Sequence, residues 1–253
     1  GETVFYPQGT QAEDMLGLYS QIFQTIEVDS TVYGTPRDTT IEGWVEKTPA
    51  NFIFSLKVPR EITHDFSLRP GSYTVMEEFV ATAKLLGEKL GVILIQLPAS
   101  FESDKINAQN LRDFLVELPT DLRFAIEFRH PGWFVEWTFE EFSARGIAIA
   151  LVEGKWIENE AMFRAAAATK TDFAYVRIMG ERDLDKFDRL ARPRDPELQT
   201  WAREIGTLAA NNIFVYIDNF FEGHAPATAR KLQAMLGLPP TSPETLQEQP
   251  SLF

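Results

Sequence analysis

Residues 124–130, Phe-Ala-Ile-Glu-Phe-Arg-His, form the stretch of the sequence that best indicates the fold. The apolar residues at positions 124, 126 and 128 alternate with Ala125, Glu127 and Arg129, and this period of two is typical of a β-strand. The alternation also puts Glu127 and Arg129 on the same face. In α/β barrels the catalytic and ligand-binding residues lie at the carboxyl ends of the parallel strands. The stretch therefore predicts a buried strand that ends in a functional site, with an Arg–Glu pair that only closes the barrel as the alternative.

The composition limits the class of protein. A chain of 253 residues with 44% hydrophobic content can bury a core in one large domain or two small ones. Because cysteine is absent, disulfides, thiolate metal sites and a cysteine nucleophile are excluded, and a reducing, cytoplasmic location is expected. No apolar run approaches the roughly 20 residues of a membrane helix, so no membrane association is expected. The net charge of −13 disfavours indiscriminate binding to nucleic acid, so any polyanion requires a local basic pocket.

Short strand-like runs alternate with longer helix-like segments along the chain. The runs rich in β-branched and aromatic residues are predicted strands, namely Thr25–Thr31, Phe52–Val58, Val92–Pro98, Phe124–His130, Ile147–Glu153, Phe173–Met179 and Ile213–Asn219. Apolar residues spaced three and four apart predict helices over Gln11–Phe23, Tyr73–Leu90, Ala108–Leu118, Pro196–Ala209 and Ala225–Leu236.

This alternation predicts a parallel sheet with right-handed crossovers. No glycine-rich G-x-G-x-x-G motif follows a strand, which disfavours a dinucleotide-binding fold. We therefore expect one TIM-type (β/α) barrel over residues 1–238 and an extended C-terminal tail over residues 239–253. Seven strands can be identified, so the first strand of an eight-fold barrel, which would precede Phe5, is absent or truncated.

Several motifs, taken in order, resemble one known family. They are Phe5-Tyr6-Pro7, residues 27–33 (EVDSTVY), 54–57 (FSLK), 62–64 (ITH), 96–98 (QLP), 127–130 (EFRH), 175–177 (YVR) and 216–219 (YIDN). From about residue 3 to the C-terminus the chain is similar to the YecE-like family, domain of unknown function seventy-two. The resemblance implies a TIM-type barrel whose activity is not established. The family's opening strand, with its Gly and Trp residues, is missing here, and part of the site would be missing with it.

Polar residues gather at the predicted strand ends. The three histidines, His64, His130 and His224, each lie just after a strand. In a parallel barrel these positions share the face on which active sites lie. The same face is expected to receive Glu27, Asp29, Lys57, Gln96, Glu127, Arg129, Arg177, Asp218 and Asn219. The alternative is a structural network of paired ions inside the barrel.

This mixture of residues suits the binding of an anion and acid–base chemistry. Lys57, Arg129 and Arg177 are expected to hold a phosphate or carboxylate. The other predicted substrate-binding residues are Glu27, His64, Gln96, Asn219 and Trp133. We expect Glu127, Asp218 or Asp29 to act as general acid or base, with His130 or His224 as an acid or a ligand.

Two further kinds of chemistry stay open for the same face. A divalent metal could be bound by a set drawn from Glu27, Asp29, His130, Asp218 and His224, although no known metal-ligand spacing supports it. Paired carboxylates also fit a glycosidase, with Trp133, Trp137 and Trp156 either as a sugar platform or as packing anchors. Residues 180–196 are either a lid that contributes Arg182 or Arg189, or a solvated loop.

The C-terminal tail carries a separate signal. Its last five residues, QPSLF, resemble the motif that binds the bacterial sliding clamp. Leu252 and Phe253 would enter an apolar pocket of the clamp and Gln249 would form hydrogen bonds. Packing of these two apolar residues on the barrel is the alternative.

The leading hypothesis is a cytoplasmic barrel enzyme, a hydrolase, that acts on a phosphate-bearing and nucleic-acid-derived substrate and reaches DNA through its tail. Its ligand would be an anionic small molecule or a nucleic-acid fragment, and no cofactor is identified by the sequence. The alternatives are a non-catalytic adaptor on a degenerate barrel and a carbohydrate-active hydrolase.

Overall fold

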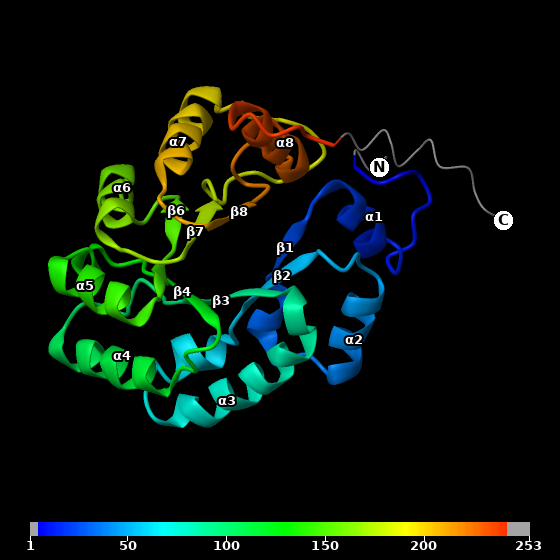
Figure 1. Cartoon of the computed structure of the whole chain (residues 1–253). Coiled ribbons are helices and arrows are strands. Elements are labelled where there is room, and N and C mark those ends of the chain that lie inside the picture. The colour runs from blue at the N-terminus through cyan, green and yellow to red at the C-terminus, as the bar shows by residue number, and fades with distance from the viewer. Residues whose placement is uncertain (1–4, 242–253) are drawn as a thin grey trace.

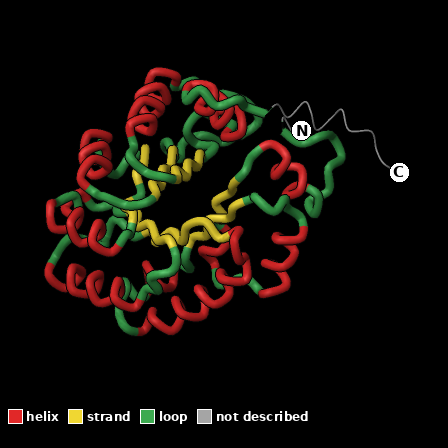
Figure 2. The backbone as a smooth tube through the Cα atoms, in the orientation of Figure 1, coloured by secondary structure: helices red, strands yellow, loops and turns green. Residues whose placement is uncertain are grey.

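Strands and helices alternate throughout residues 5–241, the part of the chain that a computed structural model describes. The strands line the inside and the helices cover the outside (Figures 1 and 2). Eight parallel strand segments are found: β1 Thr25–Val28, β2 Ile53–Lys57, β3 Leu90–Gln96, β4 Arg123–Glu127, β5 Ala148–Ile149, β6 Leu151–Glu153, β7 Phe173–Ile178 and β8 Asn212–Ile217.

The strand segments form two parallel sheets, in the orders β1-β2-β3-β4-β5 and β6-β7-β8. The segments β5 and β6 are two parts of the predicted strand Ile147–Glu153, separated by Ala150. The amide of Ala150 still donates a hydrogen bond to the Ile126 carbonyl at 2.9 Å. All seven predicted strands are therefore found in place and parallel, and each ends one to three residues earlier than predicted except the strand Ile147–Glu153.

Eight α-helices cover the sheets. They are α1 Met15–Ile22, α2 Asp38–Glu46, α3 Gly71–Ala83, α4 Lys105–Glu117, α5 Glu136–Arg145, α6 Asn159–Ala168, α7 Asp195–Thr207 and α8 Ala225–Met235 within residues 5–241. The predicted helix Tyr73–Leu90 is wrong at its end, because Gly87 has a φ of +56° and Leu90 already belongs to β3. A 3-10 turn over Lys84–Lys89 joins α3 to that strand.

The sheets are open between β8 and β1. Each of these strands pairs on one side only, β1 with β2 and β8 with β7. Within residues 5–241 no strand precedes β1, and the predicted position of the missing strand, before Phe5, lies outside the described residues. The parallel α/β layout is confirmed, and closure into a barrel stays a prediction. Side chains span the opening instead: the Tyr216 hydroxyl hydrogen-bonds to Thr25 Oγ1 at 2.7 Å and to Ser55 Oγ at 2.8 Å.

The core lies on both faces of the central strands. In β3 every residue after Leu90 is buried, because the interior covers one face and the helices cover the other. Trp133, Trp201 and Tyr175 are among the largest fully buried side chains. None of the helices within residues 5–241 has the length and apolar character needed to cross a membrane.

Candidate functional site

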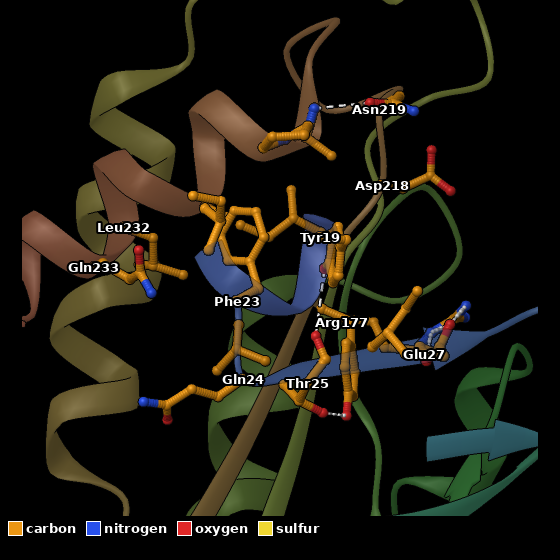
Figure 3. A pocket seen from close by; sticks show the side chains of 18 of the residues that line it. Tyr19, Phe23, Gln24, Thr25, Glu27, Arg177, Asp218, Asn219, Leu232 and Gln233 are labelled. Atoms are coloured by element: carbon orange, nitrogen blue, oxygen red, sulfur yellow. Dashed lines mark hydrogen bonds and ion pairs between the residues drawn. The ribbon is translucent and has the colours of Figure 1, made fainter. Parts of the chain in front are cut away.

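A cavity of about 640 Å³ lies at the opening between β1 with α1 and β8 with α8 (Figure 3). One part of its wall is charged and is formed by residues at or just after the carboxyl ends of strands. The charged lining residues are Glu27, Asp29, Lys57, Arg129, Arg177, Arg182 and Asp218. The other part is apolar and includes Ile22, Phe23, Ile213, Val215, Leu232 and Leu236. The cavity thus combines an ionic end with an apolar wall.

Arg177 is held between two carboxylates at the base of the charged part. Its Nη2 lies 2.6 Å from Glu27 Oε1, its Nε lies 3.0 Å from Glu27 Oε2, and its Nη1 lies 2.5 Å from Glu127 Oε2. The Tyr175 hydroxyl donates to Glu27 Oε2 at 2.5 Å. Arg177 is 3% exposed, so these three nitrogen atoms satisfy their hydrogen bonds inside the protein. Figure 3 shows Arg177 and Glu27 side by side at the cavity wall.

The electrostatics keep this network ionised. Burial opposes the charge of Arg177, but Glu27 and Glu127 together raise its pKa well above the ordinary value. Burial also disfavours the Glu127 carboxylate, but Arg177 and then Arg129 outweigh it, and the pKa of Glu127 is lowered. The pKa of Tyr175 is raised by burial and then by Glu27, so its hydroxyl stays a donor. Arg177 and Glu127 therefore stay charged at neutral pH, and Tyr175 stays neutral.

Three more cations line the cavity nearer to solvent. Lys57 Nζ lies 2.9 Å from Asp29 Oδ1, an aspartate whose side chain is 63% exposed. Arg129 Nε lies 2.8 Å from Glu127 Oε1. Arg182 lines the cavity as well and forms no ion pair with a residue in the described range. Lys57 is the last residue of β2, while Arg129 and Arg182 lie on the connections that follow β4 and β7.

The pKa of His64 is lowered by its surroundings. Burial is the first cause that lowers its pKa, followed by the charges of Arg60, Arg129 and Lys57, while Asp65 acts in the opposite direction. Its Nδ1 hydrogen-bonds to Thr63 Oγ1 at 2.8 Å. Lys57 and Arg129, at the carboxyl ends of β2 and β4, thus act on His64, even though the protein as a whole is acidic.

The other two histidines cap local structure. His130 Nδ1 accepts a hydrogen bond from the Gly132 amide at 3.2 Å, and His224 Nδ1 accepts one from the Ala227 amide at 3.3 Å. The five predicted metal candidates, Glu27, Asp29, His130, Asp218 and His224, do not converge on one point. Among residues 5–241 no three His, Asp or Glu side chains are placed to hold a metal ion.

Three residues predicted to bind substrate, His64, Trp133 and Gln96, do not line the cavity. Trp133 is 0% exposed, its Nε1 donates to the Phe101 carbonyl at 2.7 Å, and its ring stacks on those of Phe101 and Phe128. The expectation for Trp133 is corrected: the indole is a core side chain. Gln96 is also buried, and its Nε2 donates to the Leu97 carbonyl at 3.2 Å.

Asp218 and Asn219 follow β8 and line the cavity. Asp218 Oδ1 accepts from the Phe220 amide at 2.9 Å, which fixes the direction of the carboxylate. Asn219 Oδ1 accepts from the Ala225 amide at 2.8 Å and so anchors the start of α8 (Figure 3). Asp218 therefore faces the cavity, while the amide oxygen of Asn219 holds the loop in place.

The segment 180–196 is attached to the body of the protein. Arg192 forms a two-pronged ion pair with Asp183 at 2.5 and 2.9 Å. Its backbone amide also donates to the Glu222 carbonyl at 3.1 Å, and Arg194 Nη2 lies 2.8 Å from Glu153 Oε1. Of the two arginines predicted to serve the site, only Arg182 lines the cavity; Arg189 does not.

The predicted tail motif, Gln249, Leu252 and Phe253, lies outside the described residues, so clamp binding stays a prediction. Leu238, Pro239 and Thr241, the described part of the C-terminal end, line the cavity.

Comparisons with known proteins place these features in context. A family model described as "Protein of unknown function DUF72" matches residues 2–251. The UPF0759 protein YunF of Bacillus subtilis is 25% identical over 257 residues, covering 92% of this chain and 90% of the relative. The UPF0759 protein YecE of Escherichia coli K12 is 31% identical over 129 residues, and the match spans 51% of this chain but only 46% of that relative.

Solved structures have the same fold. A DUF72 family protein from Thermotoga maritima MSB8 superposes with a TM-score of 0.73 at 25% identity, covering 91% of this chain and 92% of its own. A DUF72 family protein from Enterococcus faecalis V583 gives a TM-score of 0.73 at 21% identity, covering 90% of this chain and 96% of its own.

Proposed function

The chain belongs to the DUF72 family of proteins of unknown function, and we propose that it binds a phosphate-bearing substrate at the charged end of the cavity and hydrolyses it. The observation that carries the proposal is the balance of charge in one cavity. Four cations line it, Lys57, Arg129, Arg177 and Arg182, against the carboxylates Glu27, Asp29 and Asp218. Arg129 and Arg177 are also paired with Glu127, so Arg182 is the lining cation that has no carboxylate partner among the described residues, and its guanidinium favours an anionic ligand.

The outer cations suit the ligand better than the buried one. Arg177 has its three nitrogen atoms engaged by Glu27 and Glu127, so we assign it to positioning these carboxylates. Lys57, Arg129 and Arg182 are more accessible and keep N–H groups that can donate to phosphate oxygens. Arg182 has no competing carboxylate within the described residues, which makes it the most available of the three.

Asp218 is the best placed general base. It lines the cavity, and among the described residues its carboxylate accepts a hydrogen bond from the Phe220 amide alone. In the proposed reaction a water molecule attacks phosphorus, Asp218 takes a proton from that water, and the ester P–O bond breaks. The leaving alkoxide takes a proton from solvent. Glu127 suits this role less, because its lowered pKa makes its carboxylate a weak base and both of its oxygens are bound by arginines.

The alternative functions receive less support. A glycosidase needs one carboxylic acid that stays protonated near neutral pH. Glu27 and Glu127 instead share the guanidinium of Arg177, and the pKa of Glu127 is lowered. A non-catalytic adaptor predicts that phosphate ligands leave the melting temperature unchanged. A true site should add about 2.7 kcal/mol to the free energy of unfolding at a ligand concentration 100 times its Kd.

The test uses inorganic phosphate and p-nitrophenyl phosphate as probes, in calorimetric titration and in a hydrolysis assay. We expect Arg182→Gln to weaken phosphate binding roughly tenfold, because a charge-assisted hydrogen bond is lost. Arg145→Gln, which alters a half-exposed arginine paired with Glu141 on α5, is the matched control and should leave binding unchanged. Phosphate that fails to bind the unaltered protein would refute the proposal.

The tail motif supports a second proposal, namely that the protein docks on a bacterial sliding clamp through Gln249, Leu252 and Phe253. Titration of a clamp with the full chain and with a chain that lacks the last two residues tests it. Micromolar binding that disappears with Leu252 and Phe253 would assign the protein to DNA replication or repair. Equal binding by both chains, or none by either, would refute the docking.

A further inference from the structure

Three aromatic rings are exposed near the carboxyl ends of the strands. Tyr33 is 88% exposed, Trp156 is 44% exposed and Phe187 is 40% exposed, and no other aromatic residue within 5–241 is among the exposed large hydrophobic side chains. Each lies on a connection that follows a strand and leads to a helix: Tyr33 after β1, Trp156 after β6 and Phe187 after β7. These connections form the face on which α/β enzymes of this kind bind ligands. We refer to the three rings as the aromatic rim.

Trp156 lies next to the proposed anion site. The guanidinium carbon of Arg129 lies 5.8 Å from the centre of the Trp156 ring, and Lys155 Nζ lies 4.7 Å from it. Both distances are within the range of cation–π contacts. The indole thus has a polarised face beside a cation that lines the cavity. Because Trp156 is 44% exposed beside this cation, its ring is accessible for stacking by a flat ligand group.

The other two rings are connected to charged residues of the cavity. The ring of Phe187 packs edge-on against that of Phe220 at 5.0 Å, and the Phe220 amide donates to Asp218 Oδ1 at 2.9 Å. Tyr33 ends the 3-10 turn Ser30–Tyr33, which starts directly after Asp29, the partner of Lys57. Of the three rings, Trp156 is therefore the one in contact with a cation of the cavity wall, while Phe187 and Tyr33 are linked to the cavity only through Phe220 and through the turn after Asp29.

Rings and cations together define a ligand class. We propose that the ligand of this site is a phosphate ester that carries a nucleobase, with its base stacked on Trp156 and its phosphate bound by Arg129. Every nucleobase presents a flat π-face that stacks on aromatic side chains, and cations beside such rings bind the phosphates. This inference rests on the proposed anion site and adds the identity of the group that the phosphate is attached to.

The test compares single-stranded dT4 carrying a 5′-phosphate with an abasic tetramer that has the same phosphates and no bases. Because the two tetramers carry the same charge, the difference between their Kd values gives the contribution of the bases. We expect the Kd to be roughly tenfold lower for each stacked base. Trp156→Ala should remove most of this preference, and Trp156→Phe, which keeps a flat ring, should retain part of it. The control is Val116→Ala on the outer side of α4, because Val116 is 65% exposed and lies on a helix away from the strand ends.

The outcomes separate this inference from the proposed function. Equal Kd values for dT4 and the abasic tetramer, together with binding of inorganic phosphate, would overturn the nucleobase and leave the anion site standing. Loss of binding of all these probes would overturn both. A preference for dT4 that survives Trp156→Ala would overturn the role of Trp156. Thymidine monophosphate serves as a further arm: stacking that depends on Trp156 in this single nucleotide supports a nucleotide, and stacking only in dT4 supports a single-stranded nucleic acid.

Discussion

Arg177 on β7 binds Glu27 on β1 through two guanidinium nitrogens, although the two residues are 150 positions apart in the sequence. This pair joins the three-stranded sheet to the far edge of the five-stranded sheet. It spans the side of the molecule on which β8 and β1 are not hydrogen-bonded to each other. The ion pair therefore connects β7 to β1, as backbone hydrogen bonds connect neighbouring strands elsewhere in the sheets.

Removal of this arginine should be costly. Arg177→Met leaves Glu27 and Glu127 buried without their shared cation, and breaking a buried ion pair in this way costs about 3–5 kcal/mol. Urea unfolding at pH 7 measures the change in the free energy of unfolding. The control is Arg145→Met, which removes a partly exposed pair with Glu141 and should cost about 0.5 kcal/mol or less. Similar losses in both variants would contradict the role assigned to Arg177.

The Tyr216 hydroxyl should contribute measurably to closing the open side. Tyr216→Phe removes the hydrogen bonds to Thr25 and Ser55 while it keeps the ring, and we expect a loss of about 1–2 kcal/mol in the free energy of unfolding. Tyr73→Phe is the matched control, because the Tyr73 hydroxyl has no hydrogen bond with a described residue. If both variants unfold at the same urea concentration as the unaltered protein, the hydrogen bonds of the Tyr216 hydroxyl do not contribute to the free energy of unfolding.

Much of the fold could be predicted from the sequence, because the strands consist of β-branched and aromatic runs that are distinctive locally. The residues at which the strands end could not be predicted. The predicted strand Thr25–Thr31 stops at Val28, since the Thr31 hydroxyl hydrogen-bonds to the Lys57 carbonyl at 2.6 Å and holds residues 30–33 in a 3-10 turn. Helix α5 was not predicted, since its Trp137, Phe139 and Phe142 have low helix propensity and are placed by tertiary packing.

The residues of the candidate site were easier to predict than their partners. The strand-end residues Glu27, Lys57, Arg129, Arg177 and Asp218 all line the cavity, because parallel strands bring their carboxyl ends to one face. Which charges pair depends on contacts between distant parts of the chain. The same reason explains the error for Trp133, whose burial between the rings of Phe101 and Phe128 has no local signal.

The pH dependence of stability should reflect His64. Its pKa is lowered in the folded protein by burial and by nearby cations, whereas in the unfolded chain it has the ordinary value near 6.5. Between these two pKa values the unfolded chain binds more protons, so stability is full above pH 6.5 and is lost as the pH falls through the folded pKa. The pKa of His224 is lowered by burial and Arg230, and it acts in the same direction.

His64→Gln should reduce the change of stability with pH below pH 6.5. The urea concentration at the midpoint of unfolding, determined between pH 5 and 7.5, measures this change. Bound phosphate should raise the pKa of His64, because an anion offsets the charges of Arg60, Arg129 and Lys57. An NMR titration of the His64 ring with and without phosphate measures that shift. An unchanged pKa in saturating phosphate would mean that the anion binds elsewhere.

Substitution of Asp218 should lower the rate of hydrolysis, whereas substitution of Glu127 should lower the stability. Asp218→Asn keeps the oxygen that accepts from the Phe220 amide but removes the base, so we expect hydrolysis to fall by about 10²–10⁴-fold with the Kd for phosphate unchanged or lower. Glu127→Gln should instead lower the free energy of unfolding, because an amide offers one oxygen where Arg129 and Arg177 now bind two. Steady-state kinetics and urea unfolding on both variants measure the two effects. If Asp218→Asn hydrolyses the substrate at the original rate, the base is another group, and Asp29, which lines the same cavity, is the next residue to substitute.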